Sequence, residues 1–484
     1  MKHVKARALA AAVVVAVLAV GCSNSSDKSE GDTTTPTGGS NTPTTYQGTD
    51  FSINQPVDAQ GVTDGEIKIA SVTAKTSVLG GQEGDLNIGL EAYVDKVNDE
   101  GGIWGRKINF ASQRDDQQVN NLNTVQAMLA QDKPYAAFIA TDLFTGAKLL
   151  DKEGIPTFGW NINAEWAGPK NFFPNVAPIC FEGCPLLPHM LPTLVKSENK
   201  HKVAVIGYNV PQAAGCVNGA NDTIKAFGKE IDASIVFSDA SAQFGATDWS
   251  AQVAQMKEKG ADFLVTCVDF NADFAIAKEM QRQDIRDKVT FYHANLYNQE
   301  FVQENGSAFE GDLVLAQITA VEQQPQIPAV KEYLDYMQSH DLKITEMTMQ
   351  GWIAGTQFLD ALKAAGPDFR WDNLINAWNT QTFYTAHGWV PPIDWTKQHT
   401  DPGEGDEFRS DFECANFLQI KSGKFQPYLA EPGKPWVCFD GHKLDTWQTG
   451  VNVSFDTEEP FSITETNGKA EVSSGSTTAT TAAP

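Results

Sequence analysis

The chain has 484 residues, enough for two or three ordinary domains, and its hydrophobic content of 41% is sufficient for a packed core. Its formal net charge of −25 at pH 7 argues against nucleic acid as a partner and against adsorption to anionic lipid. Beyond the first 22 residues, no stretch is long and apolar enough to cross a bilayer.

The N-terminus predicts an export signal. Three Lys and Arg residues precede an apolar run at residues 8–20, which is shorter than the about 20 residues that a spanning helix needs. The run ends in Leu-Ala-Val-Gly-Cys at residues 18–22, which resembles a bacterial lipobox. This resemblance implies that residues 1–21 are a lipoprotein signal peptide and that Cys22 is acylated, with palmitate among its chains. Two or three acyl chains hold a protein on the extracytoplasmic face of the cell membrane. A plain secretory signal with an incidental Cys22 is the alternative.

Low-complexity segments flank the part of the chain that we expect to fold. Residues 22–62 are rich in Ser, Thr, Gly and Pro and predict a flexible linker. Residues 470–484 have a similar composition and predict a disordered tail. The folded part is therefore expected at about 64–465.

The cysteines support an oxidising compartment. Many pairings are possible among the six that follow Cys22, and their order suggests Cys180–Cys184, Cys216–Cys267 and Cys414–Cys438. Outside the cytoplasm such bonds are structural staples. Since no Cys-x-x-Cys pair occurs and no His stands at finger-like spacing, no metal site is predicted.

From residue 66 onward, short apolar strands alternate with longer helical segments. The expected strands are 67–72, 108–110, 136–140 and 156–159, followed by 203–206, 234–237, 263–266 and 289–292. The expected helices are 88–98, 119–131 and 146–153, followed by 219–227, 249–259 and 274–283. Two such series predict an α/β chain with two doubly wound, parallel-sheet lobes.

Several short segments, taken in their order along the chain, are similar to those of a known protein family. They read GEIKIASVT (65–73), VNDEGGI (97–103), GRKI (105–108), GIP (154–156), KVAV (202–205), TDWS (247–250), GADF (260–263) and FLQIKSGKF (417–425). In this order they resemble the branched-chain amino acid binding protein family, the type I periplasmic solute-binding proteins of ABC importers.

This resemblance covers about 64–430 and implies a Venus-flytrap fold whose lobes are joined by a multi-strand hinge. Lobe 1 is expected at 63–177 plus about 318–385, lobe 2 at 178–317 plus about 386–445, and a C-terminal extension at 446–484. The implied protein is a monomer without a cofactor. It would bind a small solute and work with permease and ATPase subunits.

A ligand would contact the loops that follow the strands, because open parallel sheets bind ligands at their carboxyl ends. These loops are rich in hydroxyl, amide and aromatic groups, which suit a small-molecule site. The expected contact residues are Thr73, Thr76, Gln82, Thr141, Asp142, Trp160, Asn163, Tyr208, Gln212, Asp269, Phe270, Asn295 and Tyr297.

The resemblance also assigns roles, and some residues depart from it. Thr141 and Asn163 match positions that hold an amino acid's α-carboxylate in the family, whereas Asn295 stands where an acidic residue holds the α-ammonium. Gln82 and Gln212 replace pocket tyrosines, and Asp269 falls at or beside another tyrosine position. Since a buried ammonium without a charged partner is costly, either Asp269 supplies the carboxylate or the ligand has no ammonium. We favour the second, which predicts a neutral amide-bearing or aromatic solute.

Three functions are compatible with these sequence features. The first is solute capture for an importer, and the second is a receptor of the same fold that signals to a membrane kinase. An enzyme is the least favoured, because the chain has no Gly-x-Ser-x-Gly elbow, phosphate-binding loop or zinc helix. His293 is expected in a loop at the cleft, as a hydrogen-bonding or packing residue.

Overall fold

The computed structural model describes residues 51–77, 82–176, 189–324, 326–399, 412–440, 446–455, 461–466 and 469–474. All of them fall within one compact unit. The expected signal peptide, the acylation site Cys22 and the Cys180–Cys184 pair lie outside the described residues. No helix in these described ranges has the length and apolar character needed to cross a membrane.

The first sheet is entirely parallel and has the strand order β2-β1-β3-β4-β5. Its strands are β1 (Glu66–Thr73), β2 (Lys107–Asp115), β3 (Ala136–Ala140), β4 (Thr157–Gly159) and β5 (Phe172–Pro174). The four strands predicted here are confirmed, whereas β5 was not predicted from the sequence.

Both faces of this sheet are buried at its inner strands β3 and β4. Along β3, Phe138 packs in one apolar cluster with residues of α1 and of the later helix α10 (Glu346–Ala365), whereas Ile139 packs in another with residues of α2 and α3. Successive strand residues point to opposite faces, so an apolar run without polar alternation needs a helix layer on each side. The helices that follow these strands are α1 (Leu86–Asp99), α2 (Asn121–Ala127) and α3 (Ala147–Glu153).

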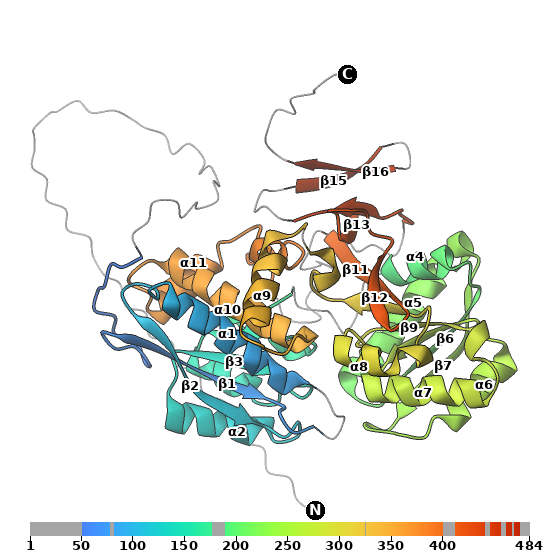
Figure 1. Cartoon of the computed structure of the whole chain (residues 1–484), viewed down its shortest axis with the longest axis horizontal. Coiled ribbons are helices and arrows are strands. Elements are labelled where there is room, and N and C mark those ends of the chain that lie inside the picture. The colour runs from blue at the N-terminus through green and yellow to red at the C-terminus, as the bar shows by residue number, and fades with distance from the viewer. Residues whose placement is uncertain are drawn as a thin grey trace, which may run out of the picture. The chain divides into compact units, whose positions relative to one another are not determined.

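Three helices from much later in the chain complete this region. They are α9 (Pro328–Ser339), α10 (Glu346–Ala365) and α11 (Trp371–Trp378), and none was predicted from the sequence. In Figure 1, α10 lies beside α1. Their backbones approach so closely that a Cβ on Gly89 would lie 1.7 Å from the main-chain oxygen of Thr348. We call the first sheet and the helices packed on it lobe 1.

The second sheet has the order β14-β13-β11-β10-β9-β8-β6-β7, with β12 paired to β11. Its parallel strands are β6 (Lys202–Tyr208), β7 (Ser234–Ala242), β8 (Phe263–Cys267), β9 (Thr290–His293) and β10 (Leu313–Ala316). The antiparallel additions are β11 (Phe412–Lys421), β12 (Lys424–Tyr428), β13 (Trp436–Asp440) and β14 (Val451–Val453). The helices of this region are α4 (Met190–Ser197), α5 (Pro211–Ile231), α6 (Ser250–Lys259), α7 (Phe270–Arg282) and α8 (Gln299–Asn305). We call this assembly lobe 2.

Two of the three expected disulfides are present among the described residues. Cys216 of α5 is bonded to Cys267 at the end of β8, and Cys414 of β11 is bonded to Cys438 of β13. Each bond joins segments that are already neighbours in the fold, which confirms these two pairings.

Two expectations about flexible segments are corrected. Residues 51–62, assigned to the linker, pack on lobe 1: the ring of Phe51 lies 5.3 Å from that of Trp104, and Arg106 Nη2 donates to the main-chain oxygen of Gln55 at 2.6 Å. Apolar residues of this segment lose contact with water when they pack on the core, and this burial stabilises the packed arrangement. At the other end, β16 (Lys469–Ser474) pairs with β15 (Phe461–Thr466), so a strand occupies the first residues of the expected tail.

Candidate ligand-binding site

A cavity of about 250 Å³ lies between residues of lobe 1 and lobe 2. Its lining comes from segments that follow β3, β4, β6, β8 and β9, the carboxyl ends of parallel strands. The main-chain carbonyl and amide groups at such edges are not all used by the sheet, so the edges favour ligand contacts. The cavity therefore lies at the sheet edges where the strand topology predicts a ligand.

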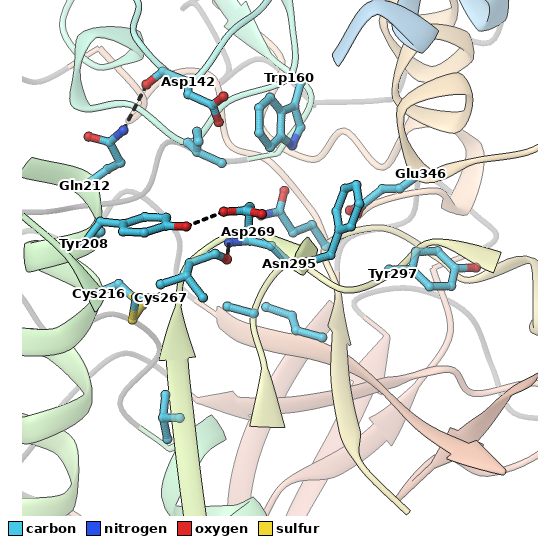
Figure 2. A pocket seen from close by; sticks show the side chains of 18 of the residues that line it. Asp142, Trp160, Tyr208, Gln212, Cys216, Cys267, Asp269, Asn295, Tyr297 and Glu346 are labelled. Carbon is cyan, nitrogen blue, oxygen red and sulfur yellow. Dashed lines mark hydrogen bonds between the residues drawn. A yellow bond between two sulfur atoms is a disulfide. The ribbon is translucent and has the colours of Figure 1, made fainter. Parts of the chain in front are cut away.

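Most of the expected contact residues line this cavity. They are Gln82, Asp142, Trp160, Tyr208, Gln212, Asp269, Phe270, Asn295 and Tyr297. The structure brings these side chains together from both lobes, as Figure 2 shows for seven of them.

The remaining four expected residues, Thr73, Thr76, Thr141 and Asn163, are not part of the lining. The Thr73 hydroxyl is buried and accepts from Asn87 Nδ2 at 3.0 Å, while the exposed Thr76 donates to Asp115 Oδ2 at 2.6 Å. Thr141 is buried within its own turn, and Asn163 Nδ2 donates to the main-chain oxygen of Asp142 at 2.7 Å. These polar groups hold the loops in shape instead of facing the cavity.

Asp269 has its oxygens engaged by the protein. As the N-cap of α7, its Oδ1 accepts from the backbone N–H of Asn271 at 2.9 Å and of Ala272 at 3.2 Å. Its Oδ2 accepts a hydrogen bond from the Tyr208 hydroxyl (Figure 2). Burial and this neighbouring carboxylate raise the pKa of Tyr208 above its usual range, so the phenol stays protonated as a donor.

Asp142 connects the two lobes through its main chain. Its carbonyl oxygen accepts from Gln212 Nε2 at 3.0 Å, as the dashed line in Figure 2 marks. Its carboxylate accepts a hydrogen bond from the Gln118 side chain. Burial raises the pKa of Asp142 to about 6, although the bond from Gln118 opposes that change.

Two further carboxyl groups, which were not predicted from the sequence, also line the cavity. Glu83 lies in the short 3₁₀ helix η1 (Glu83–Asp85), and Glu346 is the first residue of α10. Burial raises the pKa of Glu83 well above its ordinary value, with Asp142 as the largest charged contributor. Burial also raises the pKa of Glu346 to about 8.

The segment that carries Glu83 is tied to the one that carries Glu346. Lys343 Nζ lies 3.1 Å from Asp85 Oδ2, and the Thr345 hydroxyl donates to the same carboxylate, also at 3.1 Å. Thr345 in addition caps α10 through a reciprocal pair of bonds with Thr348. Because the Thr345–Asp85 bond joins residues 260 positions apart in sequence, only tertiary packing brings the two carboxyl groups to one cavity.

The walls are mainly apolar and aromatic. The aromatic members of the lining are Trp160, Tyr208, Phe244, Phe270, Tyr292 and Tyr297. The Tyr297 ring faces the cavity while its hydroxyl points away and donates to Glu322 Oε2 at 2.8 Å (Figure 2). The Cys216–Cys267 disulfide adds a further apolar surface. Such a site suits a small organic molecule with few polar groups.

Several lining residues were missed by the sequence analysis. They include Met190, Leu191, Val268, Asn298, Leu315, Gln317 and Met347. Loop residues adjacent to the selected ones, such as Val268 beside Asp269, follow the same strands. They could have been predicted from the rule that ligands bind at the carboxyl ends of parallel strands. Met190 and Met347 begin or enter helices, and no local pattern marks them as neighbours of a cavity.

His293 is not part of the lining, which corrects the expectation that it lies in a loop at the cleft. It ends β9 and is fully buried, with Nδ1 2.8 Å from Asp273 Oδ2 and Nε2 2.9 Å from Asp312 Oδ2. The described lining contains no Ser, Thr, Lys or His, and its two cysteines are bonded to each other. The arrangement offers aromatic and apolar surfaces together with a few carboxyl and amide groups.

Comparison with known proteins agrees with this geometry. The family model described as periplasmic binding protein matches residues 66–423. No protein among the curated sequences matches the chain.

Solved structures show the same fold at low sequence identity. A branched-chain amino acid ABC transporter protein from Thermus thermophilus with bound valine is 16% identical, with a TM-score of 0.61 over 76% of this chain and 96% of that one. An ABC transporter solute-binding protein from R. palustris in complex with benzoate is 15% identical, with a TM-score of 0.61 over 77% and 98%. A fatty acid ABC transporter substrate-binding protein from Thermomonospora curvata is 15% identical, with a TM-score of 0.61 over 83% and 95%.

Proposed function

Because the chain belongs to the periplasmic binding protein family, we propose that it captures a small organic solute outside the cytoplasm and delivers it to an ABC importer. The observation that carries the proposal is the cavity itself, which is lined by residues of both lobes at the carboxyl ends of their strands. A ligand held there contacts both lobes at once.

Capture would proceed by closure of the two lobes around the solute. A ligand that touches both lobes stabilises the closed form in proportion to the contacts that only this form provides. The bond from Gln212 to Asp142 belongs to the same set of contacts between lobes. Release then requires a partner that favours the open form, which is the role we assign to the permease and ATPase subunits.

The solute class follows from the walls of the cavity. Aromatic and aliphatic side chains dominate the lining, and amides such as Gln82, Asn295 and Asn298 provide directed hydrogen bonds. The benzoate and valine of the similar structures are of this size class. We propose an amino acid-sized solute with an aromatic or branched apolar body.

Attachment to the membrane completes the proposal. An acylated Cys22 would tether the mature chain to the extracytoplasmic face, with residues 23–50 as the spacer before the first described residue. The tether would keep the solute-loaded protein close to its permease and raise its effective concentration there.

Two measurements test solute capture. Native mass spectrometry of freshly purified protein is expected to show a small organic adduct, and calorimetry of protein freed of that adduct is expected to show saturable 1:1 binding without turnover. Folded protein that neither retains nor binds any amino acid, amide, amine or aromatic acid would overturn the proposal. Cross-linking of the loaded protein to permease subunits in membranes tests delivery. Cross-linking to a kinase instead would establish the receptor alternative.

A further inference from the structure

In the described part of the chain, four carboxyl groups line the cavity, and three of them belong to lobe 1. Glu83, Asp142 and Glu346 all come from lobe 1, and Asp269 faces them from lobe 2. The described residues that line the cavity include no Lys, Arg or His. A carboxylate ligand would meet four acidic groups and no basic side chain among these residues.

Glu83 differs from Asp142 and Asp269 in its hydrogen bonding. Asp142 is bonded to Gln118, and Asp269 is bonded to Tyr208 and to the first turn of α7. Glu83 is only 8% exposed, and its Oε2 has no hydrogen-bond partner. A buried acceptor without a partner costs free energy. A donor from a ligand would satisfy it.

The aromatic walls point to the same kind of ligand. Trp160 and Tyr208 lie on either side of the space in front of Asp269 and Asp142 (Figure 2), and Phe270 and Tyr292 add further rings. The faces of such rings attract organic cations electrostatically. Carboxyl groups combined with ring faces provide a site for an ammonium group attached to an apolar body.

This inference rests on the proposed function. We propose that the solute is an organic cation, a protonated amine on an aromatic or aliphatic body. Its ammonium group contacts Glu83 and Glu346. The sequence favoured a neutral solute because Asn295 occupies the position where the family places an acidic residue. The carboxyl groups come instead from η1 and from the start of α10, on the opposite lobe.

The electrostatics of the cavity support this proposal. Burial favours the neutral form of both Glu83 and Glu346, and the charged groups that raise the pKa of Glu83 further are Asp142, Asp116 and Asp269. An ammonium group placed among them attracts these groups and favours the ionised carboxylates. A carboxylate ligand adds to the repulsion instead. The formal net charge of −25 also favours encounter with cations.

The test compares ligands of one shape and three charges. Benzylamine, benzamide and benzoate share a ring and differ in charge, and the three corresponding indol-3-ylmethyl compounds repeat the series on a larger body. Calorimetry at pH 7.5 on protein freed of co-purified solute is expected to show each amine binding at least tenfold tighter than its amide, with the carboxylate weakest.

Variants identify the carboxyl groups that bind the ammonium group. Glu83→Gln and Glu346→Gln are each expected to weaken the tighter amine at least tenfold and to leave amide binding within threefold. Glu91→Gln is the matched control, since it removes one negative charge from the exposed face of α1 in the same lobe and is expected to change neither affinity. Circular dichroism melting confirms that each variant is folded.

Three results would overturn the inference. They are a carboxylate that binds as tightly as its amine, an amine affinity that is unchanged in the Glu83→Gln/Glu346→Gln double variant, and failure of both amines in protein that binds a neutral or anionic solute. Each of these leaves solute capture intact. Only folded protein that binds and retains no solute at all would overturn the proposed function as well.

Discussion

The side-chain amide of Gln212 on α5 donates a 3.0 Å hydrogen bond to the main-chain oxygen of Asp142, which follows β3. One residue belongs to lobe 2 and the other to lobe 1, and both line the cavity. The two lobes are therefore joined by a hydrogen bond of the protein itself, at the cavity where a ligand would also contact both lobes.

Removal of this bond should weaken ligand binding. A single hydrogen bond contributes about 1 kcal/mol, so Gln212→Ala is expected to lower the affinity for the native solute roughly fivefold by calorimetry. Gln338→Ala, on the exposed face of α9, is the control. Equal affinities for the two variants would show that the bond does not stabilise the loaded form.

The close contact between α1 and α10 should be intolerant of any side chain. A Cβ at Gly89 would lie 1.7 Å from the Thr348 carbonyl oxygen, so Gly89→Ala must force the two helices apart. We expect a loss of about 1–3 kcal/mol in the free energy of unfolding and weaker ligand binding, because α10 carries Glu346. Urea unfolding measures the first and calorimetry the second. Gly65→Ala, where a Cβ would meet nothing within 4 Å, should be neutral in both.

The buried carboxyl of Glu346 should make stability depend on pH. Burial raises its pKa from 4.5 to about 8 in the folded chain, and unfolding returns it to 4.5. The folded state therefore holds the proton more tightly, so this stabilising contribution is complete below about pH 4.5 and is lost as the pH rises through 8. In ligand-free protein, Glu346→Gln is expected to raise the Tm by roughly 3–6 °C at pH 9 and to leave it unchanged near pH 4.5. A Tm difference that is the same at both pH values would contradict the assignment.

The two disulfides should have separable effects. Replacement of Cys216 and Cys267 together by Ala is expected to lower the free energy of unfolding by about 2–4 kcal/mol and also to weaken ligand binding, because both residues line the cavity. Replacement of Cys414 and Cys438 by Ala should lower stability but leave affinity unchanged, since neither is part of the described lining. Denaturant unfolding and calorimetry on both pairs distinguish the two effects.

Lipid attachment is tested at Cys22. Cys22→Ser is expected to abolish incorporation of labelled palmitate and to move the protein from the membrane fraction to the medium or periplasm, because a single serine provides no acylation site. Ser23→Ala, one residue later, should leave both properties unchanged. Palmitate incorporation that persists in Cys22→Ser would contradict the lipobox assignment.

The sequence determined the parallel core of both lobes and the loops where a ligand would bind. Apolar runs of strand length alternate with helical spacing, and this local pattern already specifies β1 and β3 with the loops that follow them. It also suggested the pairings of Cys216 with Cys267 and of Cys414 with Cys438. These features could be predicted because each depends on neighbouring residues or on simple order along the chain.

Only the tertiary structure decided which side chains face the cavity and what charge they bring. Thr73 was expected at the site, yet its hydroxyl is used by Asn87, because the direction of a side chain at a strand end depends on the helix packed above it. Glu83 and Glu346 lie far apart in the chain, and neither belongs to a local motif. They line the same cavity because glycines let α1 and α10 approach closely and because Lys343 and Thr345 bind Asp85. Such contacts depend on backbone geometry between distant segments, which local periodicity does not encode.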